Sequence, residues 1–218
     1  MVEQKTDFQF DRELDFSAIR ELFTNDQYHQ LSQFAQLLGS VGVERGLIGP
    51  READRIWSRH ILNCAALVPL LPDSGNIVDL GSGAGLPGVV VAILRQRQQV
   101  ILLEPLLRRE NWLLEITERL ALRNVQVIRG RAEDEAGKLK AAVVVSRAVA
   151  RFPKLLTWSR PLLDRGGELI ALKGSSVAEE IAEVTSAQRA GWIWPPKVSK
   201  LALLPGVEFT TAVELIRR

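Results

Sequence analysis

The sequence predicts an α/β fold in which a doubly wound, mostly parallel sheet of seven strands carries helices on both faces. Three observations predict it. From residue 76 onward, short apolar runs alternate with longer segments of helical periodicity, the pattern of a parallel sheet with right-handed crossovers. The last two strand-like runs follow each other without a helix between them, so the final strand should be antiparallel. The residues before 76 show only helical patterns and should form an N-terminal helical extension.

The N-terminal extension should contain two helical stretches. After residue 15, Ile19, Leu22 and Phe23 begin a series of apolar residues at spacings of three and four. The pattern breaks at "GSVGVERGLIGP" and resumes at residue 51, directly after Pro50, to run to Pro72. We therefore divide the chain into an extension at 1–73, packed on the core, and a domain at 74–218.

The domain has seven strand-like runs and four helical segments. Apolar and β-branched residues identify the runs, and helical periodicity identifies the segments between them. The strands are predicted at 76–80, 100–104, 125–129, 142–146, 168–173, 198–205 and 208–216. The helices are predicted at 86–95, 106–122, 151–163 and 177–190.

Composition excludes several classes of protein. The 218 residues are 46% apolar and 25% charged, an ordinary balance for a globular chain. The N-terminus "MVEQKTDFQF" lacks a basic segment followed by an apolar run, and no stretch approaches the roughly 18 apolar residues of a membrane span, so we expect a cytoplasmic protein without a membrane partner. A single cysteine, Cys64, and two distant histidines, His29 and His60, indicate neither a disulfide nor a metal site.

The stretch "NIVDLGSGAGLPG" ends the first predicted strand in an acid, Asp79, and three glycines, Gly81, Gly83 and Gly85. Open α/β sheets bind ligands at this end of their strands, and glycines let the backbone approach a ligand closely. The spacing D-x-G-x-G-x-G is not the dinucleotide fingerprint, whose third glycine would fall at Leu86, and it lacks the lysine of a phosphate-binding P-loop. A tight turn without a ligand is the alternative.

Acidic residues end the next two strands as well. Glu104 lies about 20 residues beyond the glycines, where a carboxylate can accept from both hydroxyls of a ribose. In "RGRAEDE", Glu133 or Asp134 can accept from an adenine amino group. Each acid alone could be a solvated turn former, but three at successive strand ends favour a nucleoside site.

These motifs resemble a known family. "VDLGSGAG", "LLEPLLRRENWL", "GRAED" and "LLDRGGELIALKG" are similar, in order, to the Rossmann-like class I S-adenosylmethionine-dependent methyltransferases. More narrowly, "SRHILNCAAL", "DLGSGAGLPG", "RGRAE" and "VVVSRAVA" resemble the ribosomal RNA small subunit methyltransferase G family, also called glucose-inhibited division protein B. The resemblance implies methylation of N7 of one guanine in a loop of 16S ribosomal RNA in the decoding region.

The resemblance also implies site residues. It places S-adenosylmethionine against the glycine loop. A carboxylate would bind the ribose, residues after the third strand would contact the adenine, and an arginine at the end of the fourth strand would also bind. The implied cofactor residues are Asp79, Gly81, Gly83, Gly85, Leu86, Glu104, Ala132, Glu133 and Arg147. The chain departs from the family at Asn63-Cys64, where many members carry Asp-Ser.

The absent motifs favour N7 chemistry. Enzymes that methylate exocyclic amino groups commonly carry D/N-P-P-Y/F at the fourth strand end, where this chain has "SRAV". Methylation at a pyrimidine C5 needs a cysteine nucleophile, and we expect Cys64 to pack as a small apolar residue. Guanine N7 already carries an in-plane lone pair, so its attack needs proximity and alignment but no general base. We therefore assign no catalytic acid or base.

Basic residues near the strand ends are candidates for RNA contact, because RNA phosphates attract them. His60 could contact RNA or make a packing contact, and Arg147 could hold a cofactor carboxylate or a phosphate. Phe152 is the aromatic that we expect to stack on the target guanine, whereas Trp112 and Trp158 should be core residues. The candidate RNA-binding residues are Arg59, His60, Arg131, Arg151, Phe152 and Lys173.

Two other functions share these features. A small-molecule methyltransferase would keep every cofactor residue, but the basic rim and the "SRHIL" and "SRAVA" matches speak against it. A non-catalytic RNA-binding protein on the same fold would not need the intact glycines and acids. We expect a monomer acting on 16S ribosomal RNA or the small subunit, and the sequence does not choose between these two substrates.

Overall fold

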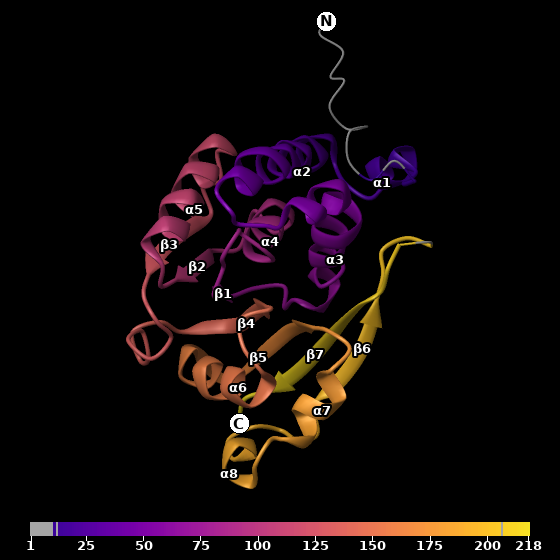
Figure 1. The fold of residues 1–218 in the computed structure, drawn as a ribbon. Coiled ribbons are helices and arrows are strands. Elements are labelled where there is room, and N and C mark those ends of the chain that lie inside the picture. The colour runs from indigo at the N-terminus through magenta and orange to yellow at the C-terminus, as the bar shows by residue number, and fades with distance from the viewer. Residues whose placement is uncertain (1–10, 12, 206) are drawn as a thin grey trace, which may run out of the picture.

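Seven strands form one sheet at the centre of the computed structural model, which describes residues 11, 13–205 and 207–218 (Figure 1). They lie in the order β3-β2-β1-β4-β5-β7-β6, and only the pairs that involve β7 are antiparallel. The predicted fold class and its antiparallel last strand are confirmed. The strands are β1 (Ile77–Leu80), β2 (Val100–Glu104), β3 (Val125–Arg129), β4 (Ala141–Arg147), β5 (Leu163–Lys173), β6 (Lys197–Leu201) and β7 (Thr210–Ile216).

The strand order changes direction at β1: β2 and β3 are added on one side of it, and β4 and the later strands on the other. This strand pairs with β2 on one side and β4 on the other, so that Asp79 lies opposite Leu102 and Val145. All residues of β1 and β2 are buried, as expected for parallel strands covered on both faces. The carboxyl ends of β1 and β4 therefore flank the crevice in which open α/β sheets bind ligands.

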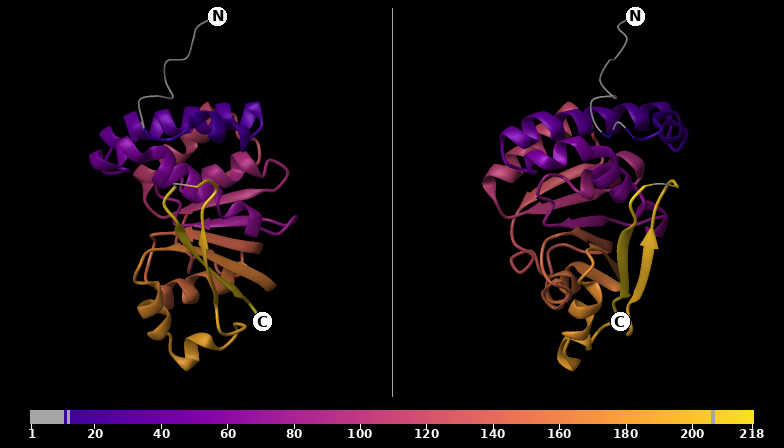
Figure 2. Two further views of the ribbon diagram at one scale, coloured as in Figure 1. Left: turned by 90° about the vertical axis from the view of Figure 1, so that its right-hand side faces the viewer. Right: turned by 45° about the vertical axis from the view of Figure 1, so that its right-hand side comes forward.

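Helices cover both faces of the sheet (Figures 1 and 2). Buried residues of α2, α4 and α5 belong to one hydrophobic cluster, and those of α6 and α7 belong to a second. Figure 2 shows the N-terminal helices at one end of the molecule and α7 and α8 at the other. The helices are α1 (Phe16–Glu21), α2 (Asn25–Leu37), α3 (Leu62–Ala65), α4 (Gly88–Leu94), α5 (Leu107–Arg119), α6 (Phe152–Ser159), α7 (Val177–Ala182) and α8 (Ser186–Arg189).

Several element boundaries differ from the predicted ones. The segment from 50 to 70 is helical except for a turn at 66–67, but only α3 is α-helix: Pro50–Arg55 and Val68–Leu70 are 3-10 helices and Ile56–Ile61 is π-helical. The predicted helix at 177–190 is two helices, because the Thr185 side chain accepts a hydrogen bond from Gln188 N and starts α8. The predicted strand at 198–205 ends earlier, with β6.

The N-terminal extension shares a hydrophobic core with the sheet. Phe34 of α2 lies in the same buried cluster as Val89 of α4 and Ile116 of α5. Gln30 Nε2 also donates a hydrogen bond of 2.9 Å to Leu120 O. The division into 1–73 and 74–218 stays a prediction.

In the part of the chain that the structure describes, no helix is long and apolar enough to cross a membrane. The segment "MVEQKTDFQF", in which we expect no leader, lies outside the described residues.

Candidate active site

A cavity of about 460 Å³ opens at the carboxyl ends of β1, β2 and β4. The loops after these strands and after β3 form most of its wall, and the N-terminal extension contributes Leu47, Ile48 and His60. The volume lies within the roughly 300–1,000 Å³ of small-molecule sites. The candidate residues that line it are Gly81, Gly83, Leu86, Glu104, Arg131, Ala132, Glu133, Arg147 and His60.

The three glycines after β1 all have positive φ angles, but they serve different purposes. The angles are +73° at Gly81, +55° at Gly83 and +98° at Gly85. A Cβ on Gly81 would lie 2.5 Å from Val149 Cγ2, and one on Gly85 would lie 2.7 Å from Val89 Cγ2. A Cβ on Gly83 would have no such neighbour within 3.7 Å. Gly81 and Gly85 therefore permit close packing, and Gly83 leaves room at the cavity.

Asp79 and Gly85, both predicted to bind the cofactor, do not line the cavity. Asp79 is fully buried beneath the loop, where its Oδ2 accepts a hydrogen bond of 2.9 Å from Gly88 N. Burial raises the pKa of this carboxyl to about 7. Asp79 thus fixes the first turn of α4 and supports the loop without reaching the ligand space.

Glu104 is held in place by backbone groups on both sides of the cavity. Its Oε2 accepts a hydrogen bond of 2.9 Å from Gly83 N, and its Oε1 accepts one of 3.0 Å from Leu106 N. Arg109 Nη1 lies 3.9 Å from Oε2. The side chain is only 2% exposed, so its position is fixed before a ligand arrives. Each carboxylate oxygen keeps a further lone pair that can accept from a ligand hydroxyl.

The loop after β3 and helix α6 close another side of the cavity. Trp158 of α6 lines it and donates a hydrogen bond from Nε1 to Glu133 Oε1. The prediction that Trp158 is a core residue holds in part, because Trp158 is partly buried against the second hydrophobic cluster but also faces the cavity. Trp112, by contrast, is 1% exposed as predicted, and its Nε1 donates a hydrogen bond of 3.0 Å to Ala84 O in the glycine loop.

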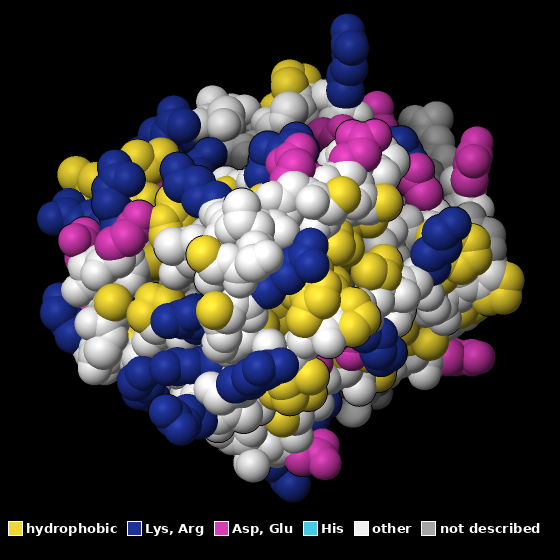
Figure 3. All heavy atoms as spheres, turned by 90° about the horizontal axis from the view of Figure 1, so that it is seen from below, with side chains coloured by type: hydrophobic (Ala, Val, Ile, Leu, Met, Phe, Trp, Pro, Cys, Tyr) yellow, Lys and Arg dark blue, Asp and Glu magenta, His cyan; other side chains and the backbone are white. Residues whose placement is uncertain are grey.

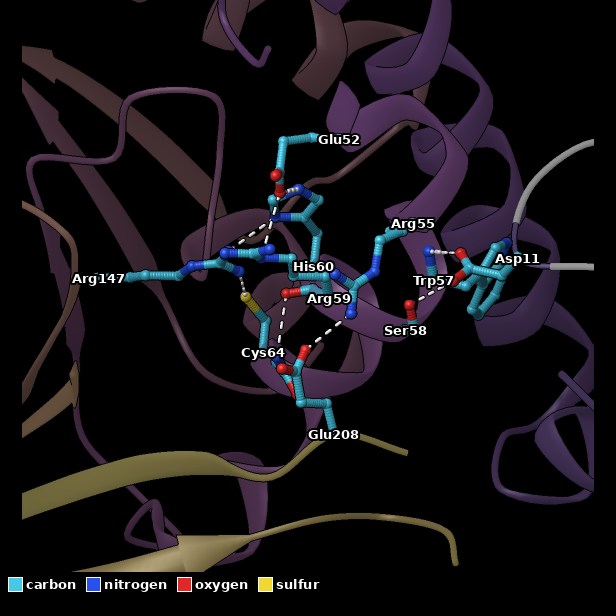
Figure 4. Close-up of polar contacts among 11 residues, drawn as sticks. Asp11, Glu52, Arg55, Trp57, Ser58, Arg59, His60, Cys64, Arg147 and Glu208 are labelled. Carbon is cyan, nitrogen blue, oxygen red and sulfur yellow. Dashed lines mark hydrogen bonds and ion pairs between the residues drawn. The ribbon is translucent and has the colours of Figure 1, made fainter. Parts of the chain in front are cut away.

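Arg147 points from the end of β4 toward the N-terminal extension (Figure 4). Its Nη2 donates a hydrogen bond of 2.7 Å to His60 Nδ1, and its Nη1 donates one of 3.4 Å to Cys64 Sγ. Cys64 is fully buried, and burial raises the pKa of its thiol. The sulfur is therefore a neutral acceptor for Arg147, which is a role that the sequence analysis missed.

His60 is held in its neutral form. Burial and, to a smaller extent, the positive charges of Arg147, Arg59 and Arg55 together lower its pKa from 6.5 to about 3. Because Nδ1 accepts from Arg147, the ring proton belongs on Nε2, which lies 3.1 Å from Glu52 Oε2. His60 is 5% exposed and positions Arg147, so direct contact with RNA, one of the two roles that we left open, does not fit its place.

Two other candidate RNA residues are corrected by their surroundings. Phe152 is fully buried in the cluster beneath α6 and cannot stack on a base. Lys173 lies 2.5 Å from Glu180 Oε2 and donates a hydrogen bond of 2.8 Å to Ala150 O, with a side chain that is 7% exposed. Arg151 forms an ion pair with Glu183 at the surface. Lys173 and Arg151 are thus both paired with carboxylates. Of these two side chains, Arg151 is the exposed one.

Comparison with known proteins identifies the family. The model of the family described as rRNA small subunit methyltransferase G matches residues 27–193. The chain belongs to this family. Among curated relatives, the ribosomal RNA small subunit methyltransferase G of Thermobifida fusca is 54% identical over 166 residues, which cover 76% of this chain and 70% of the relative. That of Nocardioides sp. is 47% identical over 198 residues, which cover 90% and 79%.

Solved structures share the fold of this family member. A predicted O-methyltransferase from Agrobacterium tumefaciens aligns with a TM-score of 0.54 and 23% identity, covering 72% of this chain and 80% of that one. TYW2 of M. jannaschii in complex with AdoMet aligns with a TM-score of 0.51 and 19% identity, covering 75% and 78%. At these identities the likeness establishes the Rossmann-like methyltransferase fold alone.

The residues present fit S-adenosylmethionine, the cofactor of this class of enzyme. Gly83 leaves space that a Cβ would occupy, and the buried Glu104 carboxylate offers two acceptors of the kind that a ribose diol needs. Glu133 and Ala132 line the cavity at the β3 end, where Glu133 Oε1 accepts a hydrogen bond from Trp158 Nε1. In the described ranges, no cluster of three or more His, Cys, Asp or Glu side chains is placed to hold a metal ion.

Proposed function

We propose that this chain transfers a methyl group from S-adenosylmethionine to N7 of a guanine in 16S ribosomal RNA. The family supplies the reaction class, and one observation on the site carries the choice of N7. The imidazole that lines the cavity, His60, already accepts a hydrogen bond of 2.7 Å from Arg147, and burial with the neighbouring arginines lowers its pKa to about 3. It is therefore too weak and too occupied a base to remove a proton from an amino group.

Guanine N7 makes no demand for such a base. S-adenosylmethionine supplies, when bound, a methyl group on a positively charged sulfur. Glu104 and the glycine loop fix the ribose and the neighbouring part of the cofactor, and Arg147 holds an anionic group at the β4 end. Alignment of two reactants in this way can supply about 7–11 kcal/mol of a reaction barrier without acid or base catalysis.

Arg147 could bind either the carboxylate of the cofactor or a phosphate of the RNA. Its guanidinium can grip a carboxylate or a phosphate with two parallel hydrogen bonds, which lysine cannot do. In this proposal it serves the cofactor side, because His60 and Cys64 hold it at the edge of the cofactor cavity. The enzyme acts in the cytoplasm as a monomer, and its substrate is 16S ribosomal RNA, free or within the small subunit.

The test is mass mapping of 16S ribosomal RNA after reaction with labelled S-adenosylmethionine, using free RNA and small subunits in parallel. A single guanine should gain the methyl group. A substrate with 7-deazaguanine at that position keeps the base-pairing edge but lacks the N7 lone pair, so it should bind and gain no methyl. Methylation of the deaza substrate would contradict N7 attack, and label in a metabolite pool alone would indicate a small-molecule enzyme.

The pH dependence gives a second reading of the same proposal. Since no proton leaves before the methyl arrives, the single-turnover rate on saturating RNA should not require a base that titrates between about pH 6.5 and 8.5. A rate that rises tenfold per pH unit across this window would contradict N7 attack and indicate methylation of an exocyclic amino group.

A further inference from the structure

A second cavity, of about 1,180 Å³, lies beside the cofactor cavity. We call it the hairpin groove, because the β6–β7 hairpin forms one of its walls. The π-helical segment Ile56–Ile61 forms another, and the loops after β4 and β5 form the floor. Its lining includes Arg59, Arg147, Ser175, Lys200, Phe209 and Thr211.

The two cavities meet at the end of β4. Arg147, Ala148 and Val149 line both of them, whereas none of the other three sizeable cavities found among the described residues shares a lining residue with the cofactor cavity. A methyl acceptor must come within about 3–3.5 Å of the donor, so it has to occupy space that adjoins the cofactor. The hairpin groove is the space that satisfies this condition.

Phe209 gives the groove a surface for a base. It is 67% exposed, an unusually open position for a phenyl ring, and it is the aromatic side chain in the groove lining. Unstacked bases of single-stranded RNA bind to such rings, because every base has a π-face. Phe209 therefore fits the role that the sequence analysis gave to the buried Phe152.

The residue before Phe209 contacts the N-terminal extension. Glu208 accepts a hydrogen bond of 2.9 Å from Arg55, which ties this end of the hairpin to the N-terminal extension (Figure 4). This ion pair places the ring near the segment that carries Arg55 and Arg59.

Basic side chains flank the ring. Arg59 and Lys200 are exposed and come from two separate elements of the lining, the π-helical segment and β6, and Arg59 Nε lies 3.3 Å from Glu52 Oε2. Lys and Arg side chains also gather on the face that carries α6, α7 and α8 (Figure 3), so positive charge alone does not locate the RNA. What distinguishes the groove is that cations, an aromatic ring and the cofactor cavity adjoin one another there.

We propose that the hairpin groove binds the acceptor nucleotide of a single-stranded RNA segment, with a base stacked on Phe209 and phosphates contacting Arg59 and Lys200. This proposal rests on the proposed function, since it takes RNA as the substrate.

The experiment measures binding of a fluorescent single-stranded 16S ribosomal RNA loop to the full chain saturated with S-adenosylhomocysteine. Phe209→Ala should weaken RNA binding by about 5- to 150-fold, the range of one lost base stack. Phe209→Tyr keeps a ring and should bind as the native protein does. Leu114→Ala, at another half-exposed apolar side chain on α5, is the matched control and should change nothing.

Two further readouts separate this proposal from the proposed function. Lys200→Gln should reduce the slope of affinity against salt concentration by about one, as expected for a lost phosphate contact. Affinity for S-adenosylhomocysteine, measured by calorimetry, should be unchanged in all of these variants. If Phe209→Ala keeps the native RNA affinity and the protein methylates guanine normally, the proposal that the groove binds RNA is contradicted. The proposed function is then unaffected. Weakened RNA binding in Phe209→Ala, with no methyl on guanine N7 in the native protein, would support the groove and overturn the proposed function.

Discussion

The cofactor cavity and the hairpin groove adjoin each other but are built in different ways. The cofactor cavity is formed by loops that follow successive strands, and its central carboxylate, Glu104, is buried and bonded to two backbone amides. The groove joins segments near residues 59, 147, 173 and 209, and its exposed side chains include Arg59, Lys200 and Phe209. A small, rigid ligand is matched by a preorganised site, whereas a flexible RNA strand is matched by side chains that can adapt.

The largest expected effect concerns the support under the cofactor cavity. The folded state raises the pKa of Asp79 from 3.8 to about 7, so between these values the folded chain binds a proton that the unfolded chain has lost. This group therefore makes the protein less stable as pH rises through that window, by about 4 kcal/mol in total at 1.36 kcal/mol per pKa unit. Asp79→Asn should remove this loss.

The measurement is urea unfolding of both proteins between pH 4.5 and 8. The variant should gain stability relative to the native protein as pH rises. His60 acts with the opposite sign, because its lowered pKa costs stability as pH falls from 6.5 toward 3, so the two groups partly cancel in the native protein. A difference between the two proteins that is independent of pH would contradict the prediction.

The next effect tests how tightly the same support is packed. A Cβ on Gly88 would lie 2.3 Å from Leu102 Cδ2 and 2.4 Å from Asp79 Oδ2, both inside the core. Gly88→Ala should lower the free energy of unfolding by about 3 kcal/mol, as expected for overpacking. Gly174→Ala, at a glycine of the groove lining with no atom within 4 Å of the added Cβ, is the control and should change it by less than about 1 kcal/mol. Equal unfolding midpoints for Gly88→Ala and the native protein would contradict the prediction, because they would show that the backbone around residue 88 can shift to accommodate the added Cβ.

A smaller effect is expected on cofactor affinity. Glu104→Ala should weaken binding of S-adenosylhomocysteine by roughly 10- to 150-fold, because charge-assisted hydrogen bonds to the ribose contribute about 1.5–3 kcal/mol. Calorimetry provides the measurement. Glu110→Ala, on α5 outside the cavity lining, should bind normally. Unchanged affinity in a folded Glu104→Ala protein would remove this residue from the site.

The smallest effect concerns the attachment of the hairpin. Arg55 and Glu208 form an exposed ion pair, with side chains 46% and 61% exposed, and such pairs contribute about 0–1 kcal/mol. Arg55→Ala should therefore change stability by less than about 1 kcal/mol and leave S-adenosylhomocysteine affinity unchanged. A loss of cofactor affinity in this variant would mean that the two cavities are less separate than their construction indicates.

Sequence reasoning located the cofactor cavity well because its signals are local. Glycines and acids that directly follow strands lie at the carboxyl edge of a parallel sheet, so their positions can be read from the sequence. Glu104 and Glu133 do line the cavity. The family resemblance and the fold were confirmed by the comparisons. The individual roles of these residues toward the cofactor remain predictions.

The candidate RNA-binding residues were harder to predict, and placing Phe152 among them was an avoidable error. Phe152, Leu155, Leu156 and Ser159 form the buried stripe of α6 at spacings of three and four, which leaves Trp158 outside the stripe. Helical periodicity alone therefore could have placed Phe152 in the core and Trp158 at its edge. The pairing of Lys173 with Glu180, by contrast, joins a strand to a separate helix and is not encoded in any local pattern.

Arg147 forms part of the wall between two binding spaces, and this has a thermodynamic consequence. A negatively charged group that approaches the guanidinium from one side changes the electrostatic potential on the other side. If occupation of the groove changes cofactor affinity by some factor, linkage requires the cofactor to change affinity in the groove by the same factor. Any such coupling would act through a single cation, held by a neutral imidazole and a thiol, and would need no domain movement.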